Sequence, residues 1–594
     1  MAVMAKAVGS LRRAAHALAA SAFVCLLAPA FAQSATVPVE GVPSSLRDDL
    51  DGLLEQEEAP DSLFAARRQA QRAADTIARL LESEGYFAAE VDPWAEGVEQ
   101  FSRGVDVEIG PLFVIGDTAI AYSGDAPDEA TRNAIEEWLG LLPIGVPARA
   151  QPILDVSDEM LRTLENSGYA DAAIEPVDAV ADGTQHTLDL TFRINAGPRI
   201  TYDDLDIAGL DRTRRDFIHN LRPWRAGDPV SQEQLDEFRT RLSSTGLFSR
   251  ATVALEEAPQ ETSRDVVVTL TEGPRRTIAL GGSASTSEGL GADAEWETRN
   301  VTGRADSITV AARAATLERR LRLSYDRPHV GQYDRNLELA AELEDFETDA
   351  FDQTGASLSA RLDQQLTRRV RGEIGVEFAY ASIEDARTRA LSLDRRELYL
   401  LAVPVAAEYT GVRDILDPVN GVRARLFVEP GVTYGDDTIG FTRIVGEASA
   451  YRELGSNKLV GAVRGRVGTI VGPAGLPPDR LFYAGGGGSV RGYEYQSLSP
   501  RDANGEIIGG RSLVEASAEL RYRSSDTLGY VAFVDAGAAS ESGEPSFDNT
   551  KAGAGLGVRY YAGFGPLRAD IAVPLDKGPG DADFQIYISI GQAF

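Results

Sequence analysis

The stretch from residue 512 to residue 537, SLVEASAELRYRSSDTLGYVAFVDAG, decides the fold of the C-terminal half of this 594-residue chain. Apolar and polar residues alternate on both sides of a short polar turn, SSDT. A period of two is typical of β-strands with one apolar and one polar face. The first strand places Val514, Ala516, Ala518, Leu520 and Tyr522 opposite Glu515, Ser517, Glu519 and Arg521, and the second places Leu528, Tyr530, Ala532, Val534 and Ala536 opposite Phe533, Asp535 and Gly537.

The same alternation recurs after residue 275 in segments separated by Gly, Asp, Asn and Pro. About sixteen such segments, an even number, predict an antiparallel transmembrane β-barrel over residues 275–594, with lipid outside and water inside. A soluble β-sandwich would alternate similarly but would not need so many strands. The segments begin near Arg276, Leu290, Ala305, Arg319, Arg335, Gln353, Val370, Arg396, Gly421, Ile439, Asn457, Ser512, Leu528, Lys551, Pro566 and Asp583. The last one would turn Phe584, Ile586, Ile588, Ile590 and Phe594 outward and Gln585, Tyr587, Ser589 and Gly591 inward.

Residues 1–32 have the pattern of a secretory signal peptide. Positive charges at Lys6, Arg12 and Arg13 precede an apolar run, and Ala30-Phe31-Ala32 supplies a small–x–small cleavage pattern. The alternative, an N-terminal membrane anchor, is disfavoured because the apolar run falls short of the ~20 residues that a spanning helix needs. The only cysteine, Cys25, lies inside this segment, so we expect neither disulfides nor cysteine-based metal sites after it.

Composition excludes several classes of function. The formal net charge of −32 argues against a nucleic-acid partner, whose binding needs clustered basic charge. The four histidines are scattered, and no pair of them has the spacing of metal ligands. We find no Ser/His/Asp arrangement in an elbow motif and no phosphate-cradling loop, so the sequence predicts no enzyme, no cofactor and no metal.

Before residue 275 a unit with both helical and strand patterns occurs three times. Each unit has a helix that ends at a glycine, where positive φ is needed, followed by two strands and a Gly-Pro step. A strand, two helices and two strands per unit resemble the POTRA domain, and we expect such units at residues 33–111, 112–198 and 199–274. Their helix-ending glycines are Gly85, Gly168 and Gly246, and their last strands alternate through Val105, Val107 and Ile109; Leu188, Leu190, Phe192 and Ile194; and Val266, Val268 and Leu270.

A long stretch from Val471 to Arg511 separates the eleventh and twelfth predicted strands, where it would be the sixth extracellular loop. Loops of this length without secondary structure are uncommon unless they are functional. The stretch contains Val490-Arg491-Gly492-Tyr493, and here the sequence resembles the BamA/TamA superfamily of outer-membrane assembly barrels, whose loop signature folds back into the lumen. Further matches are Gly509-Gly510, Phe533-Val-Asp535-Ala-Gly537 and Gly563-Phe-Gly565-Pro566-Leu-Arg-Ala-Asp570.

Strand alternation gives this resemblance independent physical content, because it places Glu519, Phe533 and Asp535 in the lumen. An arginine that enters a partly desolvated lumen needs carboxylate partners. We therefore predict that Arg491 lies between Glu519 and Asp535 beside Phe533, held by charge-assisted hydrogen bonds. The alternative is an ordinary surface-loop arginine. Inward glycines would leave room for the loop backbone, and these are Gly553, Gly555 and Gly557.

Three POTRA-like units make the chain most similar to the TamA branch of the superfamily. The resemblance implies a periplasmic arm, an assembly or translocation role for outer-membrane protein clients, and a TamB-like partner anchored in the inner membrane that spans the periplasm. Alternatives that stay open are a passive secretion pore and a conduit that delivers lipid to the outer membrane. The mechanism implied is a weak seam between the first and last strands, for which the candidate residues are Ile278, Leu280, Gly281, Gly282, Ile588, Gly591 and Phe594.

Overall fold

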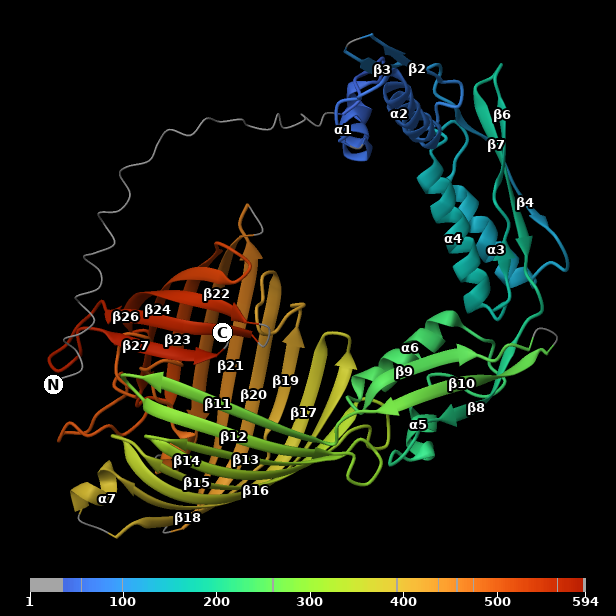
Figure 1. Ribbon diagram of the computed structural model, residues 1–594. Coiled ribbons are helices and arrows are strands. Elements are labelled where there is room, and N and C mark those ends of the chain that lie inside the picture. The colour runs from blue at the N-terminus through green and yellow to red at the C-terminus, as the bar shows by residue number, and fades with distance from the viewer. Residues whose placement is uncertain are drawn as a thin grey trace, which may run out of the picture. The chain divides into compact units, whose positions relative to one another are not determined.

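The computed structural model describes residues 36–590 except 55, 99, 259–260, 392–393, 436, 456–457, 474 and 563–564. Three small sheets are followed by a closed β-barrel (Figure 1). The predicted signal peptide, Gly591 and Phe594 lie outside the described residues. The chain divides into two compact bodies. The first two sheets belong to the first body, and most of the third sheet belongs with the barrel to the second. Within the described residues no helix combines the length and apolar character that crossing a membrane requires.

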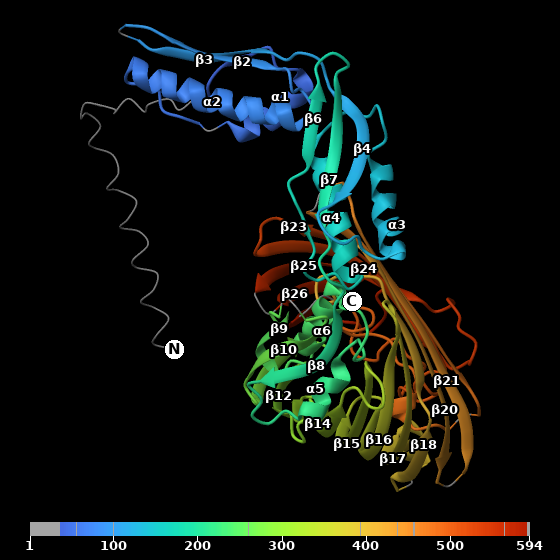
Figure 2. The same cartoon turned by 90° about the vertical axis from the view of Figure 1, so that its right-hand side faces the viewer.

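The first unit packs two helices against one face of a three-stranded sheet, as Figure 2 shows for α2. Ser62 begins α2 by accepting a hydrogen bond from the backbone N–H of Ala65, a favourable N-cap. Apolar residues at helical spacing, including Ile77 and Leu81, then pack against Val105 of the central strand. The elements are β1 (Val39–Glu40), α1 (Ser44–Leu53), α2 (Leu63–Ser83), β2 (Glu90–Glu96) and β3 (Ser102–Glu108).

The second and third units repeat this order, so the predicted α+β units are confirmed. The alternating residues of their last strands are buried, as predicted: Phe192 is 0% and Val268 is 0% exposed. A difference lies in the second unit, where the strand before the last one is split in two. Its elements are β4 (Val114–Tyr122), α3 (Glu129–Trp138), α4 (Ala150–Asn166), β5 (Ala173–Ile174), β6 (Asp178–Asp182) and β7 (Thr187–Asn195); the third unit has β8 (Thr201–Ala208), α5 (Arg215–Leu221), α6 (Gln232–Ser244), β9 (Phe248–Leu255) and β10 (Ser263–Glu272). The domain limits at residues 111, 198 and 274 stay predictions.

Two equivalent glycines show why the units begin alike. Gly41 and Gly209 each have positive φ (89° and 85°) directly after the first strand of their unit. A Cβ atom at Gly41 would lie 2.0 Å from the carbonyl oxygen of Val107, and one at Gly209 would lie 1.9 Å from that of Leu270. Only glycine allows both this backbone conformation and this approach to the central strand.

The barrel has sixteen antiparallel strands, as predicted. All sixteen start within two residues of the predicted positions. The eighth strand is interrupted at Pro404, which has no N–H to donate to the ladder, and both of its halves pair with the same neighbours. The strands are β11 (Arg276–Ser285), β12 (Gly289–Arg299), β13 (Ser307–Ala315), β14 (Glu318–Arg327), β15 (Arg335–Glu347), β16 (Phe351–Thr367), β17 (Val370–Asp385), β18 (Arg396–Ala402) with β19 (Val405–Thr410), β20 (Gly421–Tyr434), β21 (Ile439–Glu453), β22 (Leu459–Val471), β23 (Ser512–Arg523), β24 (Leu528–Ser540), β25 (Lys551–Ala562), β26 (Gly565–Pro574) and β27 (Gln585–Ile590). A short helix that we did not predict, α7 (Ala386–Leu391), follows β17.

The two faces of the barrel wall differ as the alternation predicts. On β24, Tyr530 and Val534 are 47% and 48% exposed on the outer face, whereas Phe533 and Asp535 are 3% and 0% exposed toward the lumen. The apolar outer face fits a lipid environment. Arginine–carboxylate pairs connect neighbouring strands of the inner wall, among them Arg313–Asp293, Arg320–Glu342, Arg322–Glu338, Arg361–Glu373, Arg371–Asp363 and Arg464–Glu447.

One carboxylate, Glu272 at the end of β10, holds the loop between β8 and α5, which in turn contacts the barrel. Its Oε1 accepts hydrogen bonds from the backbone N–H groups of Asp211, Arg212 and Thr213 at 3.2, 3.0 and 2.9 Å. Thr213 in turn accepts a bond from the side-chain amide of Asn300 in the barrel, at 2.8 Å. Burial alone would raise the pKa of Glu272, but the bonds from Arg212 and Thr213 outweigh it and lower the pKa from 4.5 to about 2.

This loop should therefore loosen in acid. A lowered pKa in the folded state contributes stability above the unfolded pKa of 4.5, and that contribution is lost as the pH falls toward about 2. We expect hydrogen-exchange protection of the Asp211, Arg212 and Thr213 amides, corrected for intrinsic rates, to fall through this window in the full chain. Glu272→Gln should lower protection at neutral pH and abolish the pH dependence. Equal pH profiles for both proteins would contradict this role of Glu272.

Candidate functional site

The candidate site is built around the segment between β22 and β23, residues 472–511, which we call the inward loop. Its central part is buried against the inner barrel wall: Val490 is 0%, Arg491 2% and Tyr493 1% exposed. Near its start, the inward loop forms a short 3-10 helix (Pro478–Arg480). Phe482 follows this helix and packs in one cluster with Leu513 and Ala539 of the barrel wall. The inward loop therefore occupies the lumen next to the C-terminal strands.

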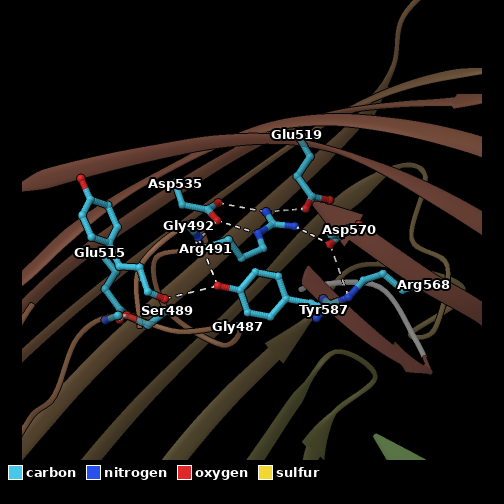
Figure 3. A network of polar contacts seen from close by, with 12 residues as sticks. Gly487, Ser489, Arg491, Gly492, Glu515, Glu519, Asp535, Arg568, Asp570 and Tyr587 are labelled. Carbon is cyan, nitrogen blue, oxygen red and sulfur yellow. Dashed lines mark hydrogen bonds and ion pairs between the residues drawn. The ribbon is translucent and has the colours of Figure 1, made fainter. Parts of the chain in front are cut away.

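Arg491 contacts three carboxylates from three strands (Figure 3). Its Nε and Nη2 donate to Asp535 on β24 at 2.6 and 2.9 Å. Nη2 also donates to Glu519 on β23 at 2.8 Å, and Nη1 donates to Asp570 on β26 at 3.0 Å. The backbone N–H of Arg491 adds a fifth hydrogen bond, again to Asp535, at 3.2 Å. The planar guanidinium, with its five N–H donors, suits a ring of carboxylates in a way that an ammonium group does not.

The wall around Arg491 leaves space for the guanidinium and its backbone. The guanidinium carbon lies 3.4 Å from the centre of the Phe533 ring, a cation–π contact in a site shielded from water. A Cβ atom at Gly553 would lie 2.0 Å from the carbonyl oxygen of Arg491, and one at Gly555 would lie 2.4 Å from the Phe533 ring. Gly557 faces the Asp570 side chain. Of the three glycines predicted to leave room for the loop backbone, Gly553 therefore does so, whereas Gly555 and Gly557 leave room for side chains of the wall.

Other arginines share the carboxylates of this cluster. Arg521 donates to the second oxygen of Glu519 at 2.9 Å, and Arg559 and Arg568 lie 2.5 and 3.5 Å from Asp570. Asp535 differs from Glu519 and Asp570, because the hydrogen bonds that its carboxylate accepts come from Arg491. Removal of Arg491 would therefore leave the buried Asp535 carboxylate without its cation, whereas Glu519 and Asp570 would keep one.

The residues that flank Arg491 are also held in place. Gly492 has a φ of 102°, and a Cβ atom there would lie 2.8 Å from the backbone of Val573. The hydroxyl of Tyr493 donates to the carbonyl oxygen of Ala552 at 3.0 Å and accepts from the N–H of Asp576 at 3.2 Å. The structure thus brings together Val490, Arg491, Gly492 and Tyr493 with Glu519, Phe533 and Asp535.

Sequence reasoning missed two members of this cluster. These are Asp570, which binds Arg491, and Tyr587 on the last strand, whose hydroxyl accepts from the N–H of Gly492 at 3.1 Å. The sequence placed Tyr587 on the inward face but predicted neither residue as a partner of the loop. Alternation on β26 would have placed Asp570 on the lumen side, which was the available signal. Among the described residues, no group of three His, Cys, Asp or Glu side chains is arranged to hold a metal ion.

A second arginine, Arg480, anchors the inward loop to a different part of the wall. It forms ion pairs with Glu377 on β17 and with Glu429 on β20, the latter at 3.4 Å. Glu429 is only 2% exposed. Nothing in the local sequence separates Arg480 from a surface arginine, so we did not predict this anchor. The loop is therefore held at two places that are 11 residues apart by their numbers, Arg480 and Arg491.

The candidate seam residues lie where β11 meets β27. In the described part of the chain, β27 pairs with β11 at two positions only, Ala284↔Ile588 and Ser285↔Tyr587, whereas β11 pairs with β12 at ten. Ile278 and Leu280 are 72% and 79% exposed. As seam candidates, Leu280 and Ile588 were expected to lie close to facing positions, but the register pairs Ile588 with Ala284, four residues beyond Leu280. Gly281 and Gly282 pair with β12 alone among the described residues.

Comparison with known proteins decides the family. Residues 300–594 match the Omp85 superfamily domain. The barrel belongs to the Omp85 superfamily. Two relatives of this Omp85 chain are named outer membrane protein assembly factor BamA. The one from Nitratidesulfovibrio vulgaris is 26% identical over 459 residues, which are 72% of this chain, and the one from Neisseria meningitidis serogroup B is 24% identical over 544 residues, which are 80%.

The chain spans 55% and 66% of the lengths of these two relatives. A solved structure of BamA from Haemophilus ducreyi, lacking POTRA domains 1–3, aligns with 80% of this chain and all of its own with a TM-score of 0.68 at 19% identity. That similarity shows the shared fold. Together these findings place the Omp85 chain in the superfamily of BamA and TamA type.

Loss of the arginine should release the inward loop. Arg491→Ala leaves Asp535 buried and unpaired, a situation that costs about 3–5 kcal/mol. We expect a lower midpoint of urea unfolding for the full chain and faster protease cleavage within residues 472–511. Arg491→Lys should recover little, because one ammonium group cannot reach three carboxylates in the same geometry.

Arg501→Ala is the matched control in the same loop, since Arg501 is exposed and its guanidinium donates to the nearby carbonyl oxygen of Gly505. It should change stability by less than ~0.5 kcal/mol. Equal stability and equal cleavage of the Arg491→Ala and Arg501→Ala proteins would show that Arg491 does not hold the loop.

Proposed function

We propose that this Omp85 chain is an outer-membrane assembly or translocation factor that passes protein clients through the seam between β11 and β27. Its relatives are named as assembly factors, and its barrel has an apolar outer face suited to lipid. The clients are unfolded outer-membrane proteins of the β-barrel or autotransporter type. The inward loop with Arg491, Glu519, Phe533 and Asp535 stabilises the wall beside the seam.

The observation that carries this proposal is the weakness of the seam. Two residue pairs close it among the described residues, and one further backbone bond joins Thr286 to Ile586 at 3.0 Å. A backbone hydrogen bond contributes about 0.5–1.5 kcal/mol net. Counted over the described residues, the seam is therefore the cheapest strand pairing in the barrel to break. Each other pairing of neighbouring barrel strands would cost several more such bonds.

Among the described residues, the first strand also offers an edge for further pairing. Within that part of the chain, residues 276–283 form ladder pairs with β12 and none with β27. An exposed edge strand is a template for pairing with another chain. We propose that a client strand adds to this edge, and that Gly281 and Gly282 ease the local distortion that this requires.

A passive secretion pore fits the structure less well. The inward loop lies inside the lumen and is anchored at Arg480 and Arg491. A pore would require that this loop leave its carboxylate partners. The second candidate that an observation favours is an outer-membrane end of a lipid-transport conduit, because the same edge would face lipid on its outer side.

We further propose that the three POTRA-like units form a periplasmic arm that binds a TamB-like partner, as in the TamA branch. The first sheet supports this, because β2 pairs only with β3 and leaves its other edge open in the described residues. An extended partner segment could add there as a further strand. Assembly and lipid transport would then share one partner and one arm.

Closing the seam covalently should block client insertion. Ala284→Cys with Ile588→Cys places two thiols at directly paired positions, whose Cβ atoms in antiparallel pairs lie about 4.5–5.5 Å apart. The oxidised protein should lose assembly of a model client in proteoliposomes and regain it on reduction. Ala279→Cys with Glu295→Cys, a pair within the β11–β12 hairpin, is the matched control. Undiminished assembly after complete cross-linking of the 284–588 pair would exclude the seam as the gate.

Removal of the first POTRA-like unit, residues 35–111, should abolish partner binding and leave a folded barrel. The reason is that this deletion removes the open edge of β2 but no barrel strand. Co-purification with a TamB-like partner measures the loss of binding, and heat-modifiable migration measures whether the barrel is folded. Full-strength co-purification of the truncated chain would refute the assignment of the arm.

A further inference from the structure

The tip of the inward loop lies between the two strands of the seam. The backbone N–H of Gly487 donates to the Glu288 carboxylate at 2.9 Å. Glu288 belongs to the turn between β11 and β12, on the first-strand side of the seam. Because the acceptor is charged, this bond is of the stronger kind.

The same loop also contacts the last strand. The N–H of Gly492 donates to the hydroxyl of Tyr587 on β27 at 3.1 Å, and that hydroxyl donates to the carbonyl oxygen of Tyr493 at 3.3 Å. Tyr587 is 2% exposed and is one of the two residues of β27 that pair with β11. The six-residue stretch 487–492 of the loop thus touches both sides of the seam. Figure 3 shows the side of the last strand, with Gly487 and Gly492 beside Tyr587.

Gly487 fills the space between these two contacts. A Cβ atom on it would lie 2.8 Å from the ring of Tyr587 and 3.2 Å from the carboxylate of Glu288. The neighbouring Gly488 has open space at the same position, with nothing within 4 Å. Neither Gly487 nor Gly488 has a positive φ. The two positions therefore differ in what an added methyl group would contact and not in backbone conformation.

The turn that carries Glu288 depends on the closed seam. The N–H of Glu288 donates to the hydroxyl of Ser285 at 2.9 Å, and Ser285 pairs with Tyr587. The loop tip is in turn joined to the wall, because Ser489 accepts from the N–H of Gly485 at 3.0 Å and donates to Glu515 on β23. A chain of contacts therefore runs from β23 through the inward loop to both edges of the seam.

We propose that the inward loop is a clasp on the seam, with Glu288 as the acceptor on the first hairpin, Tyr587 as the acceptor on the last strand, and Gly487 as the residue that fits between them. Glu288 and Gly487 are positioning residues: they hold β11 and β27 together and do not touch a client. The clasp rests on the proposed function, since it gives the seam its control. Three hydrogen bonds join the loop to Glu288 and Tyr587, beside two residue pairs between β11 and β27 among the described residues, so seating of the loop favours the closed seam.

Adjacent glycines provide a sharp test. Gly487→Ala should push Tyr587 away from the loop, whereas Gly488→Ala adds the same methyl group to open space. In the full chain, in detergent, we expect hydrogen exchange of the amides at 284–286 and 586–590 to rise at least about tenfold in Gly487→Ala, which corresponds to about 1.4 kcal/mol. Gly488→Ala should leave these rates unchanged. The amides of β22 and β23 serve as an internal reference that stays protected in both proteins.

The Glu288 variants separate the acceptor from general packing. Glu288→Ala should also raise exchange at the seam about tenfold, because the Gly487 N–H loses its charged acceptor. Glu288→Gln keeps a side-chain oxygen of the same reach and should restore a large part of the protection. Equal rates in Glu288→Gln and Glu288→Ala would overturn the role of Glu288 as an acceptor.

Unchanged seam exchange in both Gly487→Ala and Glu288→Ala would overturn the clasp, as would equal increases in Gly487→Ala and Gly488→Ala. Heat-modifiable migration identifies any variant that fails to fold, and the other member of the pair Gly487→Ala and Glu288→Ala then carries the test. These measurements need no client. Failure of the clasp is thus distinguishable from failure of the proposed function, which would appear as undiminished assembly by the barrel cross-linked at 284 and 588.

Discussion

The burial of one guanidinium group, that of Arg491, is the constraint on which the C-terminal wall of the barrel depends. At 2% exposure its charge must be matched within the protein, because an unpaired buried charge costs several kcal/mol. Asp535, Glu519 and Asp570 supply the match from three strands. That arrangement fixes where the loop enters the lumen, and it requires glycine on β25, where the backbone carbonyl of Arg491 would meet a Cβ atom.

The position of the loop has a second consequence at the barrel closure. Four residues before Arg491, the chain passes between Glu288 and Tyr587, so the same buried charge that seats the loop also brings its tip to the seam. A barrel normally removes its edges by full closure. This one closes with two residue pairs among the described residues, and polar contacts from the inside of the barrel add to these pairs. The hydrogen bonds from the loop can break one at a time when the loop moves, whereas a complete ladder of backbone bonds has to separate along its whole length.

Much of this organisation was predictable from local pattern. The period of two gave the strand starts to within two residues and placed Phe533 and Asp535 inside, because alternation depends only on the pleat of each strand. The carboxylates near Arg491 followed partly from the same alternation. Three contacts of the loop did not follow from the pattern: Arg491 with Asp570, Arg480 with Glu377, and Gly487 with Glu288. The distance within each of these pairs depends on the curvature of the wall and on the path of a long loop.

The sequence by itself determined the architecture: three α+β units, about sixteen strands with an apolar outer face, and a loop arginine that needs acidic partners. These are properties of periodicity and of charge, and both act locally. Only the tertiary structure decided the register of the first and last strands, which moved the partner of Ile588 from the expected neighbourhood of Leu280 to Ala284. The physical reason is that closure joins strands about 300 residues apart in sequence, and their register is set by the shear of the whole barrel rather than by either strand.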